Sequence, residues 1–209
     1  MKFVALLSSG IDSPVAIYLL SKKADEVILL HADNHPFIDT LEIGKFVRLA
    51  RYLKTVVSSK VTAMLIPNGQ SLQIYKTCCN NKFICIFCKR MMLRYAEIIA
   101  KQENADAIIM GDSLGQVASQ TLKNLRVIEQ AVSIPILRPL IGFDKDDTIQ
   151  LAKKIGTFPI SVAQTDECGA VPMKPSTQAR FEQILAEELK INIYDLIQYA
   201  IKHVKIVPF

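Results

Sequence analysis

No apolar run in this sequence of 209 residues approaches the roughly 18 residues that a membrane-spanning helix needs. The first apolar stretch, Phe3–Leu7, is short, and no small-residue cleavage site follows it, so a secretory signal is not predicted. The chain also lacks an internal repeat and a low-complexity segment. These absences predict a cytoplasmic globular protein without a membrane partner.

The composition fits a chain with a hydrophobic core. Half of the residues are hydrophobic and 22% are charged, which argues against disorder. At about 150 residues per domain, the length predicts one large domain, alone or with a small appendage. The net charge of +5 permits a polyanionic partner, although a lysine-rich solvated surface explains it equally well.

The cysteines are unevenly placed. Four of the five, Cys78, Cys79, Cys85 and Cys88, fall within a short segment. In a chain without a secretory signal, such a cluster indicates metal or redox chemistry rather than a disulfide framework.

Short apolar runs alternate with segments of helical periodicity. The predicted strands are Lys2–Leu7, Glu26–His31, Val61–Ile66 and Ala105–Met110, with a short or edge strand in Ser133–Leu140. The predicted helices are Ser13–Lys22, Ile43–Leu53, Lys89–Gln102 and Asp144–Ile155. This order predicts an α/β fold with an open, mainly parallel sheet and helices on both faces.

Two further helices are predicted near Thr177–Leu189 and Ile193–His203. We expect residues 1–175 to form the main domain and 176–209 a small helical C-terminal appendage. These helices could form a dimer contact, but packing on the domain is the simpler interpretation.

The loop Ser8–Ser13 lies between a predicted strand and a predicted helix. Its backbone N–H groups, its hydroxyls and the helix N-terminus favour binding of an anion, although an ordinary turn with a Ser cap has the same composition. Asp12 suits a metal ion that bridges to phosphates. The segment is neither a GxGxxG fingerprint nor a Walker loop.

This loop resembles the SGGxDS loop of PP-loop ATP pyrophosphatases, which have the adenine nucleotide alpha hydrolase-like fold, with Ser9 where the first glycine usually stands. Gly111–Thr121 resembles the GESLGQVASQT segment of tRNA 4-thiouridine synthetases (tRNA sulfurtransferases). Lys89–Arg94, Arg138–Lys145 and Asp166–Val171 are similar to further segments of that family. The resemblance runs from Lys2 to about Ala179.

The resemblance implies an enzyme that adenylates a uridine, with ATP and Mg²⁺, and then replaces the carbonyl oxygen with sulfur. Asp12 matches the essential loop acid and Lys145 the essential lysine, although Lys145 could also be a solvated residue at a helix start. The positions implied to bind ATP are Leu6, Leu7, Ser8, Ser9, Gly10, Ser13, His31, Ala32, Lys89, Gly111 and Gln120.

Cys168 matches the reactive cysteine of the family. Three interpretations of Cys85 and Cys88, a CxxC pair, remain open: a structural Zn²⁺ site, a redox dithiol, or an iron–sulfur cluster held with Cys168. The cluster, of 4Fe–4S or 3Fe–4S type, resembles the rhodanese-lacking branch of the family, and its open iron would hold exogenous sulfide. Cys78 and Cys79 have no counterpart there.

No RNA-binding domain of the kind found in full-length family members is recognisable. Lys89, Arg90, Arg94, Lys101 and Lys123 could offer a basic surface, as could any solvated helix face. We therefore expect tRNA to arrive with a separate RNA-binding protein or with the other subunit of a homodimer. The rival functions are another adenylating enzyme, such as an amide ligase or small-nucleotide thiolase, and a non-catalytic ATP-binding sulfur carrier or regulator.

Overall fold

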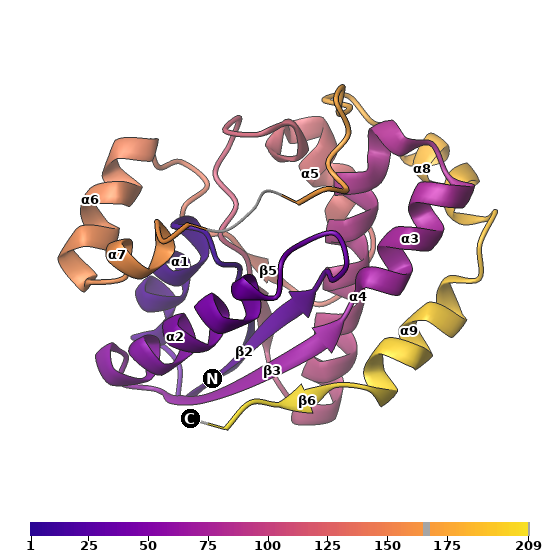
Figure 1. The fold of residues 1–209 in the computed structure, drawn as a ribbon. Helices are drawn as coiled ribbons and strands as arrows, with labels where there is room; N and C mark the ends of the chain where they lie inside the picture. Colours follow the sequence, from indigo (N-terminus) through magenta and orange to yellow (C-terminus); the bar gives the residue numbers. More distant parts are fainter. Residues whose placement is uncertain (165–167, 209) are drawn as a thin grey trace.

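The computed structural model describes residues 1–164 and 168–208, which form one six-stranded sheet with the order β5-β4-β1-β2-β3-β6 (Figure 1). The parallel strands are β1 (Lys2–Leu6), β2 (Glu26–Asp33), β3 (Lys60–Pro67), β4 (Ala107–Ile109) and β5 (Ile136–Leu137). The predicted mainly parallel sheet is therefore confirmed. The antiparallel edge strand β6 (Lys205–Ile206) was not predicted, because two residues carry no readable alternation.

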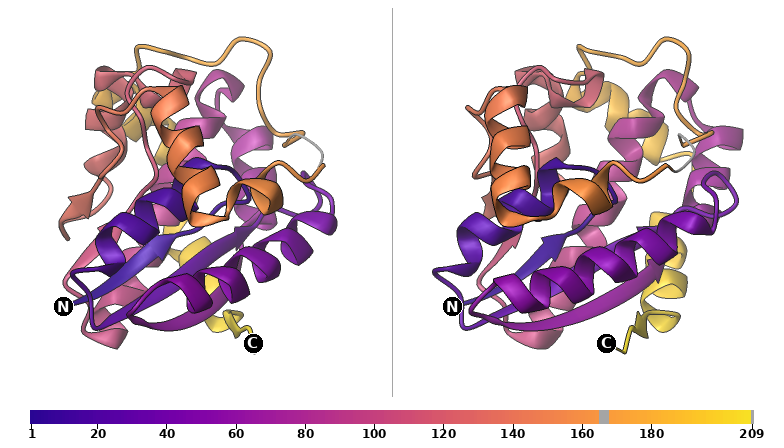
Figure 2. Two further views of the ribbon diagram at one scale, coloured as in Figure 1. Left: turned by 90° about the vertical axis from the view of Figure 1, so that its left-hand side faces the viewer. Right: turned by 60° about the vertical axis from the view of Figure 1, so that its left-hand side comes forward.

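Helices cover both faces of the sheet. One face packs against α1 (Asp12–Ser21), α2 (Leu41–Val56), α6 (Lys145–Ile155) and α7 (Phe158–Ser161), the side that Figure 2 turns toward the viewer. The other packs against α3 (Gly69–Cys78), α4 (Ile84–Glu103), α5 (Leu122–Glu129), α8 (Phe181–Glu188) and α9 (Ile193–Lys202). Two short 3₁₀ turns, Asn81–Phe83 and Ala118–Gln120, complete the described elements.

The alternation of β1 shows how the sequence builds both cores. Phe3, Ala5 and Leu7 are buried against the α1 and α2 layer. Val4 and Leu6 are buried against the α4 layer. A strand that is apolar on both faces is the expected pattern for a covered parallel sheet. The carboxyl ends of β1, β2 and β4 consequently meet at one edge, where ligands of open α/β sheets bind.

The cysteine-bearing segment, which precedes the helix predicted over Lys89–Gln102, is largely helical itself. Helix α3 ends at Cys78, and α4 begins at Ile84 rather than at Lys89. The physical reason is that Ile84 and Phe87 continue the apolar face of α4 upstream, and both are fully buried. Cys85 and Cys88 therefore project from the first turns of a long helix.

Helices α8 and α9 pack within the molecule, as expected. Ile184, Leu196 and Ala200 join the same core as α4. In the described part of the chain, no helix is long and apolar enough to cross a membrane.

Candidate active site

A pocket of about 310 Å³ opens where β1, β2 and β4 end. Most of the residues singled out in the sequence line it: Leu6, Leu7, Ser8, Asp12, Ser13, His31, Ala32, Lys89, Gly111 and Gln120. Ser9 and Gly10 belong to the same loop without lining the pocket. Sequence reasoning missed other residues of the wall, namely Leu30, Asn34, Glu42, Met92, Met110, Asp112, Val117 and Ser119.

The loop between β1 and α1 is held by its own serines. The backbone N–H of Ser8 donates to Ser13 Oγ at 2.9 Å, and the two hydroxyls lie 3.0 Å apart. Ser9 Oγ donates to Glu42 Oε1 at 3.1 Å, and Ser161 Oγ donates to Gly10 O at 3.2 Å. The loop is therefore fixed in front of the α1 N-terminus, where the helix dipole favours an anion.

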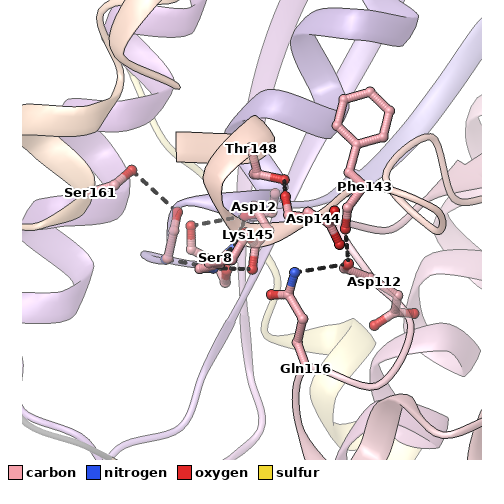
Figure 3. A network of polar contacts seen from close by, with 12 residues as sticks. Ser8, Asp12, Asp112, Gln116, Phe143, Asp144, Lys145, Thr148 and Ser161 are labelled. Carbon is pink, nitrogen blue, oxygen red and sulfur yellow. Dashed lines mark hydrogen bonds and ion pairs between the residues drawn. The ribbon is translucent and has the colours of Figure 1, made fainter. Parts of the chain in front are cut away.

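Asp12 lines this pocket and contacts Lys145, which is not itself among the lining residues (Figure 3). Lys145 Nζ lies 2.8 Å from Asp12 Oδ1 and 3.1 Å from Oδ2. A cation at the first position of α6 opposes the helix dipole, and the Asp12 carboxylate offsets that cost. The first residues of α1 and α6 are thus joined by this ion pair, which brings two helix N-termini, both favourable to an anion, to the same place.

A second network ties α6 to the loop after β4 (Figure 3). Ser113 is buried, and its Oγ donates a hydrogen bond to Phe143 O at 2.9 Å. The same Oγ accepts a hydrogen bond from Gln116 Nε2 at 2.9 Å. Thr148 Oγ1 donates to Asp144 O at 3.2 Å in the first turn of α6. These bonds fix the start of α6, and with it Lys145, relative to the pocket wall.

Gly111 brings the β4 loop against the start of α1. A Cβ atom at this position would lie 2.7 Å from both the Cα and the N of Ser13. Real Cβ atoms do not approach a backbone so closely, so only glycine allows this contact.

Asp112 is the buried centre of a charge network on the pocket wall. It contacts Lys89 Nζ at 2.6 Å, Arg138 Nε at 3.3 Å and Gln120 Nε2 at 3.4 Å. Burial alone would raise the pKa of Asp112, but the two cations outweigh it and hold the pKa below its usual value. Asp112 and Arg138 each stand in a recognised motif, yet their pairing could not be read from the sequence.

His31 lies at the end of β2 beneath the pocket. Its Nδ1 is 2.8 Å from Leu7 O, and its ring stacks on Phe46 at 4.6 Å. Because a carbonyl oxygen only accepts, Nδ1 carries the proton. Burial lowers the pKa of His31, so the ring is neutral, and Nε2 is an acceptor without a partner among the described residues.

Cys85, Cys88 and Cys168 form a second cluster of interest. All three are free thiols. Burial raises the pKa of Cys85 and raises that of Cys88 to about 12, and in both cases Cys168 lies near enough to raise it further. Asn68 Nδ2 lies 3.5 Å from Cys88 Sγ. In the described ranges, no group of three or more His, Cys, Asp and Glu side chains is arranged to hold a metal ion.

Cys168 and the remaining two cysteines, Cys78 and Cys79, have different surroundings. Cys168 begins the described segment after residue 167, and Gly169 N donates to Phe37 O at 2.7 Å. Asp166 and Glu167, part of the family-like segment, lie outside the described residues. Cys78 is exposed, whereas Cys79 Sγ donates to Glu187 O at 3.4 Å and burial raises its pKa to about 11.

The expectation that Arg90 and Arg94 offer a basic surface is wrong. Both guanidinium groups bind Glu188 on α8, with N–O distances of 2.8–2.9 Å. Arg90 and Glu188 are almost completely buried, because α8 covers this face of α4. Lys89 contacts Asp112 in the pocket, and Lys101 pairs with Glu97.

The fold and the loop after β1 together define a PP-loop domain. The profile of the family described as Thiamine biosynthesis protein (ThiI) matches residues 1–193. This chain belongs to the ThiI family, which confirms the resemblance seen in the sequence.

Curated relatives are about twice as long. A probable tRNA sulfurtransferase of Methanosarcina mazei is 39% identical over 98% of this chain and 51% of the relative. One from Thermus thermophilus is 37% identical over 100% of this chain and 52% of the relative. The chain thus spans about half the length of the curated relatives it matches.

Solved structures agree on the fold. A 4-thiouridine synthetase in complex with RNA and bound ATP superposes with a TM-score of 0.93 at 31% identity, over 99% of this chain and 55% of the other. The NMN synthetase of Francisella tularensis, at 17% identity and a TM-score of 0.57, shares the fold alone over 96% of this chain and 83% of the other.

Proposed function

We propose that this chain is an ATP-dependent sulfurtransferase that adenylates a uridine in tRNA and replaces its carbonyl oxygen with sulfur, as in 4-thiouridine synthesis. The observation that carries the proposal is the Asp12–Lys145 pair in front of the α1 N-terminus, in a chain of the ThiI family. We assign the chemistry to residues 1–175 and treat 176–209 as a helical extension. We expect a cytoplasmic protein.

The pocket divides into a nucleoside end and a phosphate end. Leu6, Leu7, His31 and Ala32 supply apolar and stacking surface for adenine. Ser8–Ser13, with Gly111 packed behind them, supply N–H and hydroxyl donors for the phosphates. Lys89 and Gln120 line the same pocket, and Asp112 contacts and orients both. We assign the α-phosphate to the side of Lys145, because Lys145 contacts Asp12 of the phosphate loop.

Adenylation requires that the uridine O4 attack the α-phosphorus of ATP. A P–O bond forms, the bond between the α-phosphorus and its bridging oxygen breaks, and pyrophosphate leaves with the electron pair. Negative charge accumulates on the phosphate oxygens in the transition state, and Lys145 stabilises it. The carboxylate of Asp12 suits Mg²⁺, which would neutralise the departing pyrophosphate. In the second step a sulfur nucleophile bonds to C4, and AMP leaves with the former carbonyl oxygen.

Cys85, Cys88 and Cys168 supply the donor set for an iron–sulfur cluster. Cys85 and Cys88 are one helical turn apart on α4, and Cys168 lies near enough to both to raise their pKa values. As the described residues stand, the three thiols are not yet arranged as a metal site, so the proposal requires them to move together when the cluster binds. When bound, such a cluster would offer an open iron for exogenous sulfide. Zn²⁺ held by the CxxC pair is the alternative, in which case Cys168 acts as a persulfide carrier with an external sulfur donor.

Pyrophosphate release tests the function. The wild-type chain should release pyrophosphate from ATP in proportion to added tRNA transcript, and the product RNA should contain thiouridine by mass spectrometry of its nucleosides. Asp12→Ala should abolish release, whereas Asp146→Asn, a matched change on α6, should not. Release stimulated by a small molecule instead of tRNA would indicate another adenylating enzyme, and ATP binding without release would indicate a carrier or regulator.

The cluster requires a separate measurement. Anaerobically purified protein should contain iron and acid-labile sulfide, with a broad visible absorption that Cys168→Ala diminishes. The exposed Cys78 provides the control, because Cys78→Ala should leave the spectrum unchanged. A colourless protein that holds zinc in both variants would contradict the cluster.

A further inference from the structure

A basic groove of about 700 Å³ lies between α5, α8 and the turn before α4, away from the ATP-pocket residues. Its lining includes four cations, Lys82, Lys123, Arg126 and Arg180, against one carboxylate, Glu182. All four cations are exposed. None of them forms an ion pair with a residue that the structure describes. Arg90 and Arg94, by contrast, are neutralised by Glu188.

The floor of this groove is fixed by hydrogen bonds around Asn124, which is fully buried. Its Nδ2 donates to Ala118 O at 2.6 Å and to Ser176 O at 2.7 Å, and its Oδ1 accepts from Ala179 N at 2.9 Å. Lys123 Nζ donates to Gln178 Oε1 at 3.0 Å. Because these contacts already hold the walls together, a ligand in the groove would not have to order them.

The groove is continuous with the ATP pocket along the chain. Val117, Ser119 and Gln120 line the ATP pocket, and α5 starts two residues later with Leu122 and Lys123. A shallow hollow shares Lys123 and Gln178 with the groove, and Leu114 and Gly115 on its wall belong to the loop that contributes Val117 to the ATP pocket. Leu114, Val117 and Leu122 along this path are 45–70% exposed, which provides apolar surface for a base.

The opposite wall of the groove leads back to Cys168. The segment after Cys168 crosses the top of the molecule and reaches α5 before it enters α8 (Figure 1). There Thr121 Oγ1 donates to Thr177 O at 2.7 Å, and Ser176 N donates to Lys82 O at 2.9 Å. The groove is thus bounded by continuations of the ATP-pocket wall and of the cysteine segment.

We propose that this groove binds the phosphate backbone of the substrate RNA and presents the reacting nucleotide to the ATP pocket. The inference rests on the proposed function, since it names the surface that holds its substrate. Exposed cations that form no ion pair with a described residue suit a string of phosphates, because each contact releases a condensed counterion. The apolar hollow then receives a base on its way to the pocket.

Binding of a fluorescent, unmodified tRNA transcript to the 209-residue chain tests this surface. The triple variant Lys123→Gln/Arg126→Gln/Arg180→Gln, called the groove variant below, should bind the transcript about tenfold or more weakly. The slope of its log binding constant against log salt concentration should be smaller in magnitude by about 2. The charge-preserving variant Lys123→Arg/Arg126→Lys/Arg180→Lys should bind as the wild type does. Lys23→Gln/Arg51→Gln/Lys202→Gln removes three exposed cations elsewhere and should have little effect.

Kinetics separate this proposal from the function on which it rests. In tRNA-dependent pyrophosphate release, the groove variant should raise the KM for tRNA and leave kcat and ATP binding unchanged. The proposal that this groove binds RNA is overturned if wild type and groove variant bind tRNA with equal affinity, or if the wild-type chain does not bind tRNA. Tight, groove-dependent tRNA binding without pyrophosphate release would instead overturn the proposed function.

Discussion

The ammonium of Lys145 and the carboxylate of Asp12 form an ion pair across 133 positions of sequence, with Nζ 2.8 Å from Oδ1. The pair joins the end of the loop after β1 to the start of α6, and its Asp12 side lines the pocket. Nearly half of the Lys145 side chain is exposed, so this ion pair contributes at most about 1 kcal/mol to the free energy of unfolding. Its placement is therefore best explained by chemistry at the site.

Lys145→Ala should lower kcat for pyrophosphate release by about 100-fold or more, because transition-state charge on the phosphate loses its cation. The melting temperature should remain close to that of the wild type. Lys154→Ala, further along α6, is the matched control and should retain full activity. A Lys145→Ala variant with wild-type kcat would remove this residue from the mechanism.

Gly111→Ala should impair both folding and ATP binding. The added Cβ would press on the Ser13 backbone, and relieving the contact should cost about 1–3 kcal/mol in unfolding free energy. The shift would also move the phosphate loop, so the Kd for ATP should rise. Gly142→Ala is the control, because nothing lies within 4 Å of its Cβ position. Urea unfolding and ATP titration of both variants decide the matter, and identical behaviour would contradict the close approach.

Asp112 makes the stability depend on pH. The pKa of Asp112 in the folded protein lies below the unfolded value of about 3.9. Its contribution to the free energy of unfolding is therefore fully present above about pH 3.9, and it is lost as the pH falls through the folded pKa. Asp112→Asn leaves Lys89 and Arg138 without a counter-charge and should cost about 2–3 kcal/mol at pH 7. The difference between variant and wild type should shrink in acid. If the difference in unfolding free energy between wild type and Asp112→Asn stays constant from pH 7 down to pH 2, the pKa of Asp112 is not lowered by folding.

Glu188 holds α8 on α4 through two guanidinium groups. Glu188→Ala leaves Arg90 buried and unpaired, so the melting temperature should fall by about 10 °C, given about 3–5 kcal/mol for one broken buried pair. The neighbouring Glu187 pairs with the exposed Lys190, and Glu187→Ala should shift the melting temperature by far less. Equal shifts in the two variants would contradict the buried network.

Local patterns were enough to predict the core elements of the fold. The strands around Val4, Ile28 and Ala63 are apolar on both faces, and this signal needs no knowledge of distant partners. The loop with Asp12 was recognisable because its residues are consecutive. Helix α5 was not predicted, and neither was β6, whose two residues carry no readable alternation.

The parts of the site that were missed depend on contacts between distant segments. Asp112 and Arg138 are 26 positions apart, and only the fold shows that they share one buried network with Lys89. Arg90 and Arg94 have the spacing of a solvated helix face, and α8, nearly a hundred residues later, buries them. The basic groove likewise combines residues before α4 with others on α5 and α8.

The central claim is that the uridine oxygen itself attacks ATP at this pocket. A tRNA transcript labelled with a heavy oxygen isotope at uridine O4 tests it directly, with AMP analysed by mass spectrometry after the reaction. If the uridine is adenylated, AMP should gain the heavy oxygen in equal proportion to the thiouridine formed. Unlabelled AMP, formed while thiouridine accumulates, would contradict adenylation of the uridine.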